Sequence, residues 1–218
     1  MDNLGGIEMK VRNYYVEKDL VKFVTEENTI REARKHLEET GFRCVPILDK
    51  AKKRFLGNVY EIDTYKYRGS LEDSVMEIAD NRDIFIHEEE SFFKIFLTIK
   101  KLPYLPVLNE KDEFIGILTH ASVMSVAEDA FAVHTQGYSI TVSVYDFDRT
   151  LAELTSLVSR FTSIQSLITL DSKKFARQIV FTIPETTSEK ELNRLIKALE
   201  DASFSVVHVT KLDANSPL

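Results

Sequence analysis

The stretch FLGNVYEIDTY, residues 55–65, is followed 59 residues later by FIGILTHASVM, residues 114–124. Both begin with an aromatic residue, an aliphatic residue and a glycine, and both continue with two more residues and a hydroxyl-bearing side chain. The polar positions that follow differ between the copies: Tyr60 and Asp63 in the first, Thr119 and Ser122 in the second. The repeated apolar frame predicts two copies of one structural unit. The changed polar pair predicts that the two copies contact different groups.

The repeat extends to both sides of this stretch. Two further pairs of segments correspond: VTEENTIREA (24–33) with IHEEESFFKI (86–95), and GFRCVPILD (41–49) with KLPYLPVLN (101–109). Each copy therefore predicts a short strand, a helix, an apolar strand, a charged turn, a second apolar strand and a second helix. One such unit is too small to bury a sufficient core, so we expect the two copies to pack on each other.

Local signals support these elements. Thr29 and Glu32 predict a capping box at the start of the first helix. PILDKAKKRFLG and PVLNEKDEFIG predict hairpins with polar tips. Residues 66–83 predict a polar linker with a short helix, and residues 119–134 predict a helix. Apolar positions with helical spacing are expected to face the core: Ile30, Ala33 and Leu37 in the first copy, and Phe92, Ile95, Phe96 and Ile99 in the second.

The chain after Gly137 follows a different pattern. Four segments predict strands: YSITVSVY (138–145), SIQSLITL (163–170), FARQIVFTI (175–183) and FSVVHVTKL (204–212). Two segments predict amphipathic helices, the second with a capping box formed by Ser188 and Glu191: DRTLAELTSLVSRF (148–161) and SEKELNRLIKALEDA (188–202). The resulting order, βαββαβ, is that of the ferredoxin-like split unit.

The repeated unit resembles a CBS motif, and two CBS motifs in tandem form a Bateman module. The resemblance is carried by RCVPILD and FLGNVYEID in the first copy and by YLPVLN and FIGILTHAS in the second. The tail resembles an ACT domain. The expected fold class is α+β, with CBS repeats at 8–66 and 67–134 and an ACT-like domain at 137–212. This order is similar to that of standalone bacterial CBS–CBS–ACT proteins, which include acetoin-utilisation-type regulators and cyclic di-AMP receptors.

The resemblance implies a nucleotide sensor, because Bateman modules bind adenine nucleotides in clefts between the paired repeats. In the family, a Thr-x-x-Asp signature after the glycine holds the phosphate side and the ribose hydroxyls. Asp63 matches the Asp in the first copy and Thr119 matches the Thr in the second, whereas Tyr60 and Ser122 replace the other members. Cyclic di-AMP has no free ribose diol, since its 3′ oxygens are esterified. The resemblance therefore favours cyclic di-AMP over AMP or ATP.

Further candidate contacts come from the starts of the apolar strands. Adenine needs a flat apolar slot, and phosphates favour an arginine fork. Arg43 lies at the edge of the expected pocket, and its counterpart in the second copy is Pro103, so an arginine clamp would be one-sided. The other candidate nucleotide contacts are Cys44, Val45, Pro46, Tyr104, Leu105 and Pro106, together with Thr25, His87 and His120.

Several of these residues have a structural alternative. Asp63, Thr119 and Ser122 lie at strand-to-helix steps and are explained equally well as helix caps. Tyr60 either fills space between the repeats or stacks on a ligand. Cys44 is also interpreted as a small core residue. Arg43 pairs either with a nearby carboxylate or with a phosphate.

Other functional classes are disfavoured. The net charge of −7 provides no general field for nucleic acid or anionic membranes, and no apolar run is long enough to cross a bilayer. No phosphate loop, dinucleotide fingerprint or nucleophile elbow is present, so we expect neither an enzyme nor a cofactor. The five histidines show no ligand spacing, which argues against a metal site. A single cysteine and a start without a signal-peptide pattern predict a cytoplasmic location.

Three hypotheses follow. The first is a receptor that binds cyclic di-AMP, or alternatively AMP or ATP, and relays it to an unknown protein target as a homodimer. The second is a ligand-free interaction scaffold dimerised through its CBS and ACT parts. The third is an amino-acid sensor acting through the tail. Its ligand turn would fall in DFDRTLAEL, where the glycine slot holds Arg149 if the motif starts at Asp146, or Leu151 if it starts at Asp148. The missing glycine disfavours this hypothesis.

Overall fold

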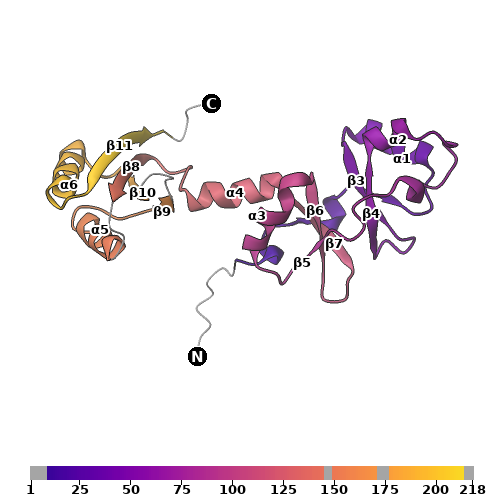
Figure 1. Cartoon of the computed structure of the whole chain (residues 1–218), viewed down its shortest axis with the longest axis horizontal. Coiled ribbons are helices and arrows are strands. Elements are labelled where there is room, and N and C mark those ends of the chain that lie inside the picture. The colour runs from indigo at the N-terminus through magenta and orange to yellow at the C-terminus, as the bar shows by residue number, and fades with distance from the viewer. Residues whose placement is uncertain (1–8, 145–148, 171–176, 214–218) are drawn as a thin grey trace. The chain divides into compact units, whose positions relative to one another are not determined.

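The computed structural model describes residues 9–144, 149–170 and 177–213, and Figure 1 labels its helices and strands. The chain divides into two compact units, Met1–Met124 and Ser125–Leu218. The division falls inside helix α4 (His120–Ala130). The three-domain boundaries at 66, 134 and 137 stay a prediction.

The N-terminal unit contains two sheets, one for each copy of the repeat. The first has the order β2-β3-β4: Val24–Thr25, Cys44–Leu48 and Phe55–Tyr60. The second has the order β1-β7-β6-β5: Val16–Glu17, Phe114–Thr119, Tyr104–Leu108 and Ile86–His87. In each copy the short first strand runs parallel to its neighbour, and the next two strands form an antiparallel hairpin. Both predicted hairpins are therefore confirmed.

The helices of the first copy follow the prediction. α1 (Ile30–Thr40) begins at Thr29, whose side chain forms the predicted capping box with Glu32. Its apolar positions Ile30, Ala33 and Leu37 are buried. α2 (Glu61–Lys66) follows β4 directly. Short 3₁₀ helices lie in the segments that precede the first strand of each copy: η1 (Val11–Asn13) and η2 (Lys18–Leu20) before β2, and η3 (Val75–Ile78) before β5.

The corresponding helix of the second copy is irregular, and one prediction for it is wrong. A 3₁₀ turn η4 (Phe92–Lys94) leads into α3 (Ile95–Thr98), and a second 3₁₀ turn η5 (Ile99–Lys101) follows. Phe92, Ile95 and Ile99 are buried as expected, but 41% of Phe96 is exposed. A 3₁₀ turn has about three residues per turn, so side chains around it leave the 3.6-residue phase of a regular helix.

The residues leading into each copy lie on the sheet of the other copy. β1 precedes β2, the first strand of the first copy's sheet, but pairs antiparallel with β7 of the second copy. Asp80 precedes β5, the corresponding strand of the second copy, but bridges Asn58 in β4 through two backbone hydrogen bonds of 2.8 and 2.9 Å. The repeated glycines lie at these crossings. A Cβ on Gly116 would lie 2.1 Å from the Val16 carbonyl oxygen, and one on Gly57 would lie 3.1 Å from that of Asp80.

Apolar side chains from both copies form the core of this unit. One cluster surrounds the sheet of the first copy and contains Val24, Ala33, Leu37, Val45, Ile47, Val59 and Val75, the last from η3. A second cluster joins the two copies and contains Val21, Leu48, Leu108 and Phe114. The shared cluster confirms that the copies pack on each other.

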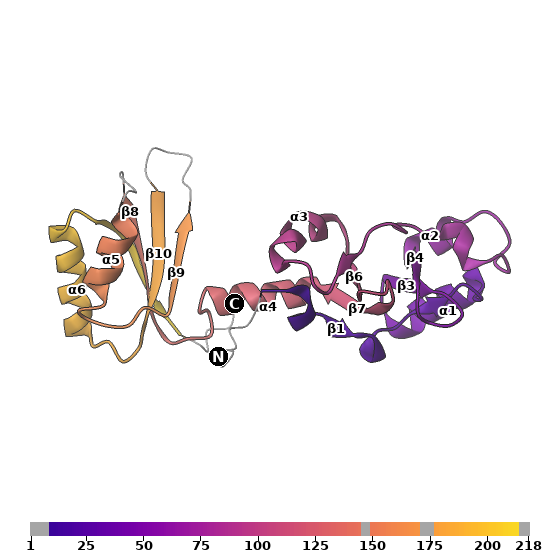
Figure 2. The ribbon, with the colours of Figure 1, turned by 90° about the horizontal axis from the view of Figure 1, so that it is seen from below.

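The C-terminal unit has the predicted βαββαβ order. Its elements are β8 (Gly137–Val144), α5 (Thr150–Val158), β9 (Ser166–Leu170), β10 (Arg177–Pro184), α6 (Glu189–Asp201) and β11 (Ser205–Leu212). The strands form an antiparallel sheet with the order β11-β8-β10-β9. Both helices lie on one side of this sheet (Figure 2). α5 is shorter than predicted, and residues 171–174, the predicted turn, lie outside the described residues.

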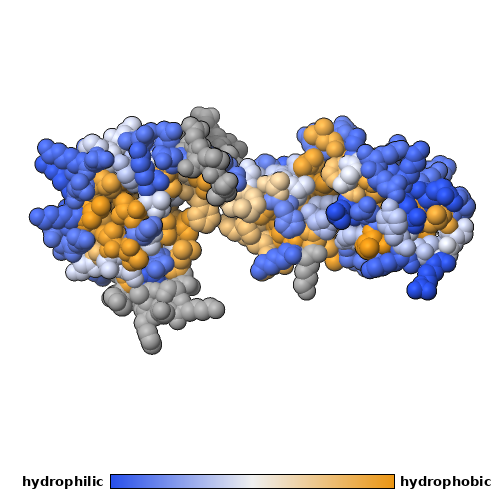
Figure 3. All heavy atoms as spheres, turned by 90° about the horizontal axis from the view of Figure 1, so that it is seen from above, coloured by the Kyte–Doolittle hydropathy of each residue, from blue (hydrophilic) through white to orange (hydrophobic). Residues whose placement is uncertain are grey.

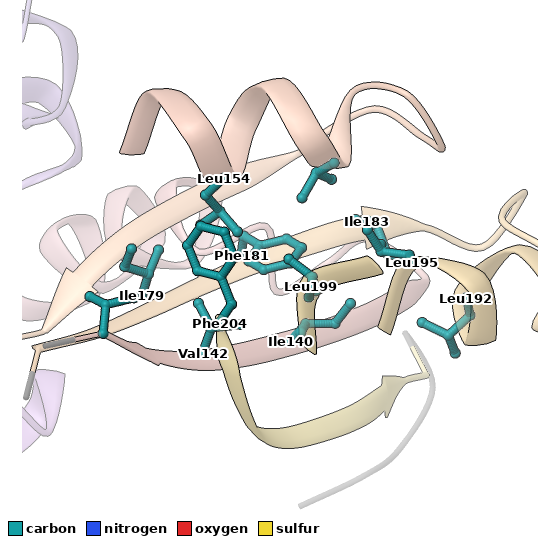
Figure 4. Close-up of a cluster of buried hydrophobic side chains, with 12 residues drawn as sticks. Ile140, Val142, Leu154, Ile179, Phe181, Ile183, Leu192, Leu195, Leu199 and Phe204 are labelled. Atoms are coloured by element: carbon teal, nitrogen blue, oxygen red, sulfur yellow. The ribbon is translucent and has the colours of Figure 1, made fainter. Parts of the chain in front are cut away.

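The core of the C-terminal unit lies between the sheet and its two helices. Apolar side chains from the strands point toward those from α5 and α6 (Figure 4). α6 begins with the predicted capping box of Ser188 and Glu191. This arrangement is consistent with an ACT domain, as the βαββαβ pattern predicts.

Polar residues cover much of the surface in Figure 3, and apolar residues gather on it in separate patches. No helix in the described part of the chain is long and apolar enough to span a bilayer.

Candidate functional site

A cleft of about 370 Å³ opens in the N-terminal unit, where strand starts from both copies meet. The lead-in to the first copy forms one wall, and β3, β6 and β7 form the others. We call it the Thr119 cleft. Its lining residues are Val16, Leu20, Val21, Lys22, Phe42, Arg43, Cys44, Val45, Pro46, Pro103, Tyr104, Ile117 and Thr119.

The lining of this cleft contains apolar and cationic side chains but no acidic ones. Most of its residues are apolar, and two are cations, Lys22 and Arg43. None of the lining residues is an Asp or Glu, although the whole chain carries 35 acidic residues against 28 Lys and Arg. An apolar slot with a cationic edge suits a flat base that carries phosphate. At the mouth, Leu20 and Phe42 expose large apolar side chains to solvent.

Arg43 lies at the edge of the cleft, as the sequence predicts. Its side chain is 92% exposed, and its guanidinium lies 3.9 Å from the carboxylate of Glu61. An exposed pair at this distance contributes little free energy. The ion pair between Arg43 and Glu61 is therefore weak, and the Arg43 side chain lies at the edge of the cleft.

A buried polar chain forms the inner wall. The Cys44 thiol donates to the Tyr104 hydroxyl over 3.6 Å, and that hydroxyl donates to Asn58 Oδ1 over 2.6 Å. Asn58 is only 2% exposed. Burial raises the pKa of Cys44 to about 11 and raises the pKa of Tyr104 well above its usual value. Both groups are therefore neutral hydrogen-bond donors near pH 7.

Thr119 combines the capping role and the cleft-lining role. Its hydroxyl accepts a hydrogen bond from the backbone N–H of Ser122 at 3.1 Å and lies 3.0 Å from the Ser122 hydroxyl. This is helix-capping geometry. Thr119 also lines the cleft, whereas Ser122 is not among the lining residues.

The counterpart positions in the first copy differ. The Tyr60 hydroxyl donates to Asn81 Oδ1 at 2.6 Å, and burial raises the pKa of Tyr60. Tyr60 is the N-cap residue of α2 but forms no side-chain capping bond. Asp63 lies inside the first turn of α2, so it does not occupy the cap position that its place in the sequence suggests. Neither residue lines the Thr119 cleft.

The other sequence candidates lie elsewhere. Thr25 contacts the Asn28 side chain in a local turn. His87 Nδ1 lies 3.3 Å from the Asn109 carbonyl oxygen, and its Nε2 lies 3.6 Å from Asp112. Neither lines the Thr119 cleft, and neither do Leu105, Pro106 and His120. His120 lies beside it, because its Nδ1 is 3.1 Å from the carbonyl oxygen of Pro103.

The structure brings six of the sequence candidates together in this cleft: Arg43, Cys44, Val45, Pro46, Tyr104 and Thr119. The sequence candidates include none of the lead-in residues that line the cleft, which are Val16, Leu20, Val21 and Lys22. The lead-in reaches the cleft because its strand β1 pairs with β7 of the second copy. In the sequence, this pairing is indicated only by the position of the lead-in before the first copy. Among the described residues, no group of His, Cys, Asp and Glu side chains has an arrangement that would hold a metal ion.

The two interlaced repeats, the cleft at their strand starts and the βαββαβ unit define a tandem CBS module followed by an ACT-like domain. The CBS domain family model matches residues 11–68 and 75–129, just over half of the chain. The chain therefore belongs to the CBS domain family, whose members are nucleotide-binding regulatory proteins, and no enzyme family matched.

Two solved structures share this fold over about half of the chain. A hypothetical conserved protein from Geobacillus kaustophilus has 25% identity and a TM-score of 0.51, covering 56% of this chain and 98% of its own. The protein CbpB in complex with c-di-AMP has 21% identity and a TM-score of 0.50, covering 55% and 84%. A CBS domain pair/ACT domain protein from Thermotoga maritima is also similar, with 24% identity and a TM-score of 0.49, covering 56% and 98%. The curated protein sequences gave no match.

Proposed function

We propose that this protein is a cytoplasmic receptor that binds cyclic di-AMP in the Thr119 cleft and transmits binding to a protein target. The carrying observation is the lining of the cleft, which combines apolar walls, two cations and no carboxylate within an acidic chain. That lining favours a ligand with aromatic bases and anionic phosphates. Membership of the CBS domain family supports a nucleotide ligand, and cyclic di-AMP is the nucleotide that we propose.

In this proposal the cleft takes one adenine. The base lies against Val45 and Tyr104, and the phosphates face Lys22 and Arg43. The second adenine lies outside, against the exposed side chains of Leu20 and Phe42. Ser122 stands where the family signature has the ribose-binding Asp. A cyclic dinucleotide lacks the free diol that such an Asp would bind, so this departure favours it over AMP or ATP.

We further propose that each chain has one nucleotide site. Tyr60 occupies the sequence position equivalent to Thr119, and its hydroxyl is already bonded to Asn81. A ligand at the equivalent place in the first copy would have to displace this partly buried hydrogen bond. The two copies are therefore unequal in the proposal, as their different polar pairs predict.

The receptor acts as a homodimer in this proposal, and the ACT-like unit serves as a dimerisation platform. Arg149 is the N-cap residue of α5 and has a φ of 64°, at the position where an ACT ligand turn starting at Asp146 would have its glycine. A side chain at this position disfavours close approach of an amino-acid carboxylate to the backbone. The turn itself, residues 145–148, lies outside the described residues.

Calorimetric titration of the full chain tests the ligand. Cyclic di-AMP is expected to bind with one ligand per chain, and AMP and ATP are expected to bind more weakly. Tighter binding of AMP or ATP would transfer the assignment to a mononucleotide. Absence of heat with all three at high micromolar concentration would refute the receptor and favour the scaffold.

A matched pair of variants tests the contact at the edge. Arg43→Ala is expected to weaken cyclic di-AMP binding by roughly 5- to 30-fold, the loss of about 1–2 kcal/mol from one charge-assisted hydrogen bond to phosphate. Lys52→Ala removes a cation at the exposed hairpin tip, outside the lining of the cleft, and is expected to leave affinity unchanged. Equal affinities for both variants would show that Arg43 does not hold the phosphate.

A further inference from the structure

A groove of about 660 Å³ runs along helix α5 in the C-terminal unit and shares no residue with the Thr119 cleft. Its polar lining is supplied by Arg149, Glu153, Ser156 and Arg160. Its apolar lining includes Leu157 and Phe204, and Phe204 is only 5% exposed. We call this feature, lined by these six residues, the α5 groove. It offers charged and apolar contacts side by side.

The polar residues of the α5 groove lie along one line of the helix. Three of them follow Arg149 by four, seven and eleven positions: Glu153, Ser156 and Arg160. An α-helix turns about 100° per residue, so these positions point within roughly 40° of one direction. Arg149 immediately precedes α5, and Arg160 lies in the turn that follows it. At about 1.5 Å per residue, the two arginines stand roughly 16 Å apart along the axis and mark the ends of the groove.

The side chains of Arg149 and Arg160 are exposed to solvent. Neither guanidinium forms a hydrogen bond or an ion pair with any residue that the structure describes. Glu153 lies between the two arginines but is paired with neither of them, and an exposed ion pair between Arg149 and Glu153 would contribute little free energy. Both guanidiniums remain unpaired although the chain has 35 acidic residues against 28 Lys and Arg. They are therefore available to carboxylates of another molecule.

The backbone at Arg149 provides an independent observation. Arg149 is the N-cap residue of α5, has a φ of 64° and forms no side-chain capping bond. Residues other than glycine adopt this left-handed region at a cost in free energy. No polar contact of the Arg149 side chain with the described residues offsets that cost. Strained residues of this kind cluster at functional positions, so the Arg149 guanidinium is expected to contact another molecule.

We propose that the α5 groove binds an extended acidic segment of the protein target. The segment has a carboxylate at each end, one for Arg149 and one for Arg160. Between them it has an apolar side chain, which packs on Leu157 and Phe204. The inference rests on the proposed transmission of nucleotide binding to a protein target, and it names the surface that the target contacts.

The dimensions of an extended peptide fit this arrangement. Its side chains at positions i, i+2 and i+4 point to the same side, and positions i and i+4 lie about 13 Å apart. The long side chains of Arg149 and Arg160 cover the remaining difference, and a guanidinium binds a carboxylate through two parallel hydrogen bonds. Glu153 lies between the two ends and repels a carboxylate at the middle position. The groove therefore selects an acidic, an apolar and an acidic residue at alternate positions.

NMR titration of the isotopically labelled full chain tests the groove with a defined probe. The probe is the peptide acetyl-Asp-Ala-Leu-Ala-Asp-amide, and its control is acetyl-Asn-Ala-Leu-Ala-Asn-amide. The Asp peptide is expected to bind with a dissociation constant of about 0.1–1 mM, the range of a short peptide with few contacts, and to shift the backbone amide signals of residues 149–160 and 202–204. Equal shifts with both peptides, or no shifts with either, would overturn the proposal. Free aspartate that gives the same shifts at the same concentration would also overturn it, because the groove would then be a site for a small carboxylate.

Three variants test the contacts. Arg160→Ala is expected to raise the dissociation constant of the Asp peptide roughly fivefold or more, through loss of a charge-assisted pair of hydrogen bonds. Arg194→Ala removes an exposed arginine on α6, outside the groove, and is expected to leave the constant unchanged. Arg149→Gly is expected to weaken binding as Arg160→Ala does without lowering the melting temperature, since glycine adopts the left-handed region freely. Equal affinities of the Arg160→Ala and Arg194→Ala chains would refute the contact.

Nucleotide titration separates this inference from the proposed function. Arg160 does not line the Thr119 cleft, so the Arg160→Ala chain is expected to bind cyclic di-AMP as the wild type does. A wild-type chain that binds cyclic di-AMP but not the Asp peptide would overturn this inference alone. A chain that binds the Asp peptide in the groove but binds no nucleotide would overturn the proposed receptor and support the groove as a docking site.

Discussion

The Tyr104 hydroxyl joins the wall of the cleft to the buried centre of the N-terminal unit. It accepts from the Cys44 thiol and donates to Asn58 Oδ1. Tyr104→Phe removes this oxygen and keeps the ring. The perturbation therefore isolates one buried hydrogen-bonding group from the apolar packing around it.

The magnitude follows from what the variant leaves behind. Asn58 is 2% exposed, so its side-chain oxygen has almost no access to replacement water. A buried acceptor without a partner costs about 1–3 kcal/mol, and loss of the weak bond to Cys44 adds little. We expect the N-terminal unit to lose this amount of stability and the C-terminal unit to lose none.

Native-state hydrogen exchange measured by mass spectrometry resolves the two units. Peptides from β4 and β6 should exchange roughly 5- to 150-fold faster in the variant, the equivalent of about 1–3 kcal/mol. Peptides from β8 and β10 provide an internal control. Tyr65→Phe is the matched variant, because Tyr65 donates to Glu38 at 2.6 Å from an exposed position. It should change exchange by less than about 0.5 kcal/mol.

Equal exchange rates for the wild type and Tyr104→Phe in the β4 and β6 peptides would refute this reasoning. They would mean that Asn58 finds another partner, or that the bond forms no part of the folded state in solution. Equal effects of Tyr104→Phe and Tyr65→Phe would show that burial does not set the cost.

Three further predictions concern other parts of the chain. Thr29→Ala and Ser188→Ala each remove a capping box, and each should cost about 1 kcal/mol in its own unit only; hydrogen exchange that slows or accelerates in both units would contradict this. Because burial raises the Cys44 pKa to about 11, its thiolate fraction is about 0.1% at pH 8 and rises roughly tenfold per pH unit towards 11. Alkylation of the folded chain should follow this rise and should slow when cyclic di-AMP is bound, whereas a rate equal to that of the unfolded chain would disprove it. Tyr60→Thr should change the calorimetric stoichiometry from one nucleotide per chain towards two, and two ligands bound by the wild type would rule out the single-site proposal.

Features encoded by neighbouring residues were predictable from sequence. The capping boxes at Thr29 and Ser188 depend on a residue three positions away, and the hairpins depend on a polar turn between apolar runs. The βαββαβ order follows from alternating periodicity for the same reason. These patterns involve residues close together in the chain, so they can be recognised in a single sequence without an alignment.

The features that could not be predicted from the sequence depend on pairing between distant segments or on the exact number of residues per helical turn. Lys22 lines the cleft because the lead-in joins the sheet of the second copy, and no pattern within the lead-in says which sheet it joins. Phe96 turned outward because 3₁₀ turns flank a very short α-helix. The Tyr60 hydroxyl donates a hydrogen bond to Asn81, 21 positions away. Comparing the sequences of the two copies does not reveal this partner.

The segment before each copy's first strand pairs with the sheet of the other copy. If the chain were cut between the copies, each fragment would therefore lack a strand or bridge that the other supplies. A chain cut within residues 69–73 would yield a first piece whose β1 has lost its sheet and a second piece whose β7 has an unpaired edge. Exposed edges of this kind drive association with any available strand. The two pieces, expressed separately, should therefore find each other and rebuild the cleft in trans. In the proposed receptor, a ligand that binds the rebuilt cleft would then favour the reassembled form over the separate pieces.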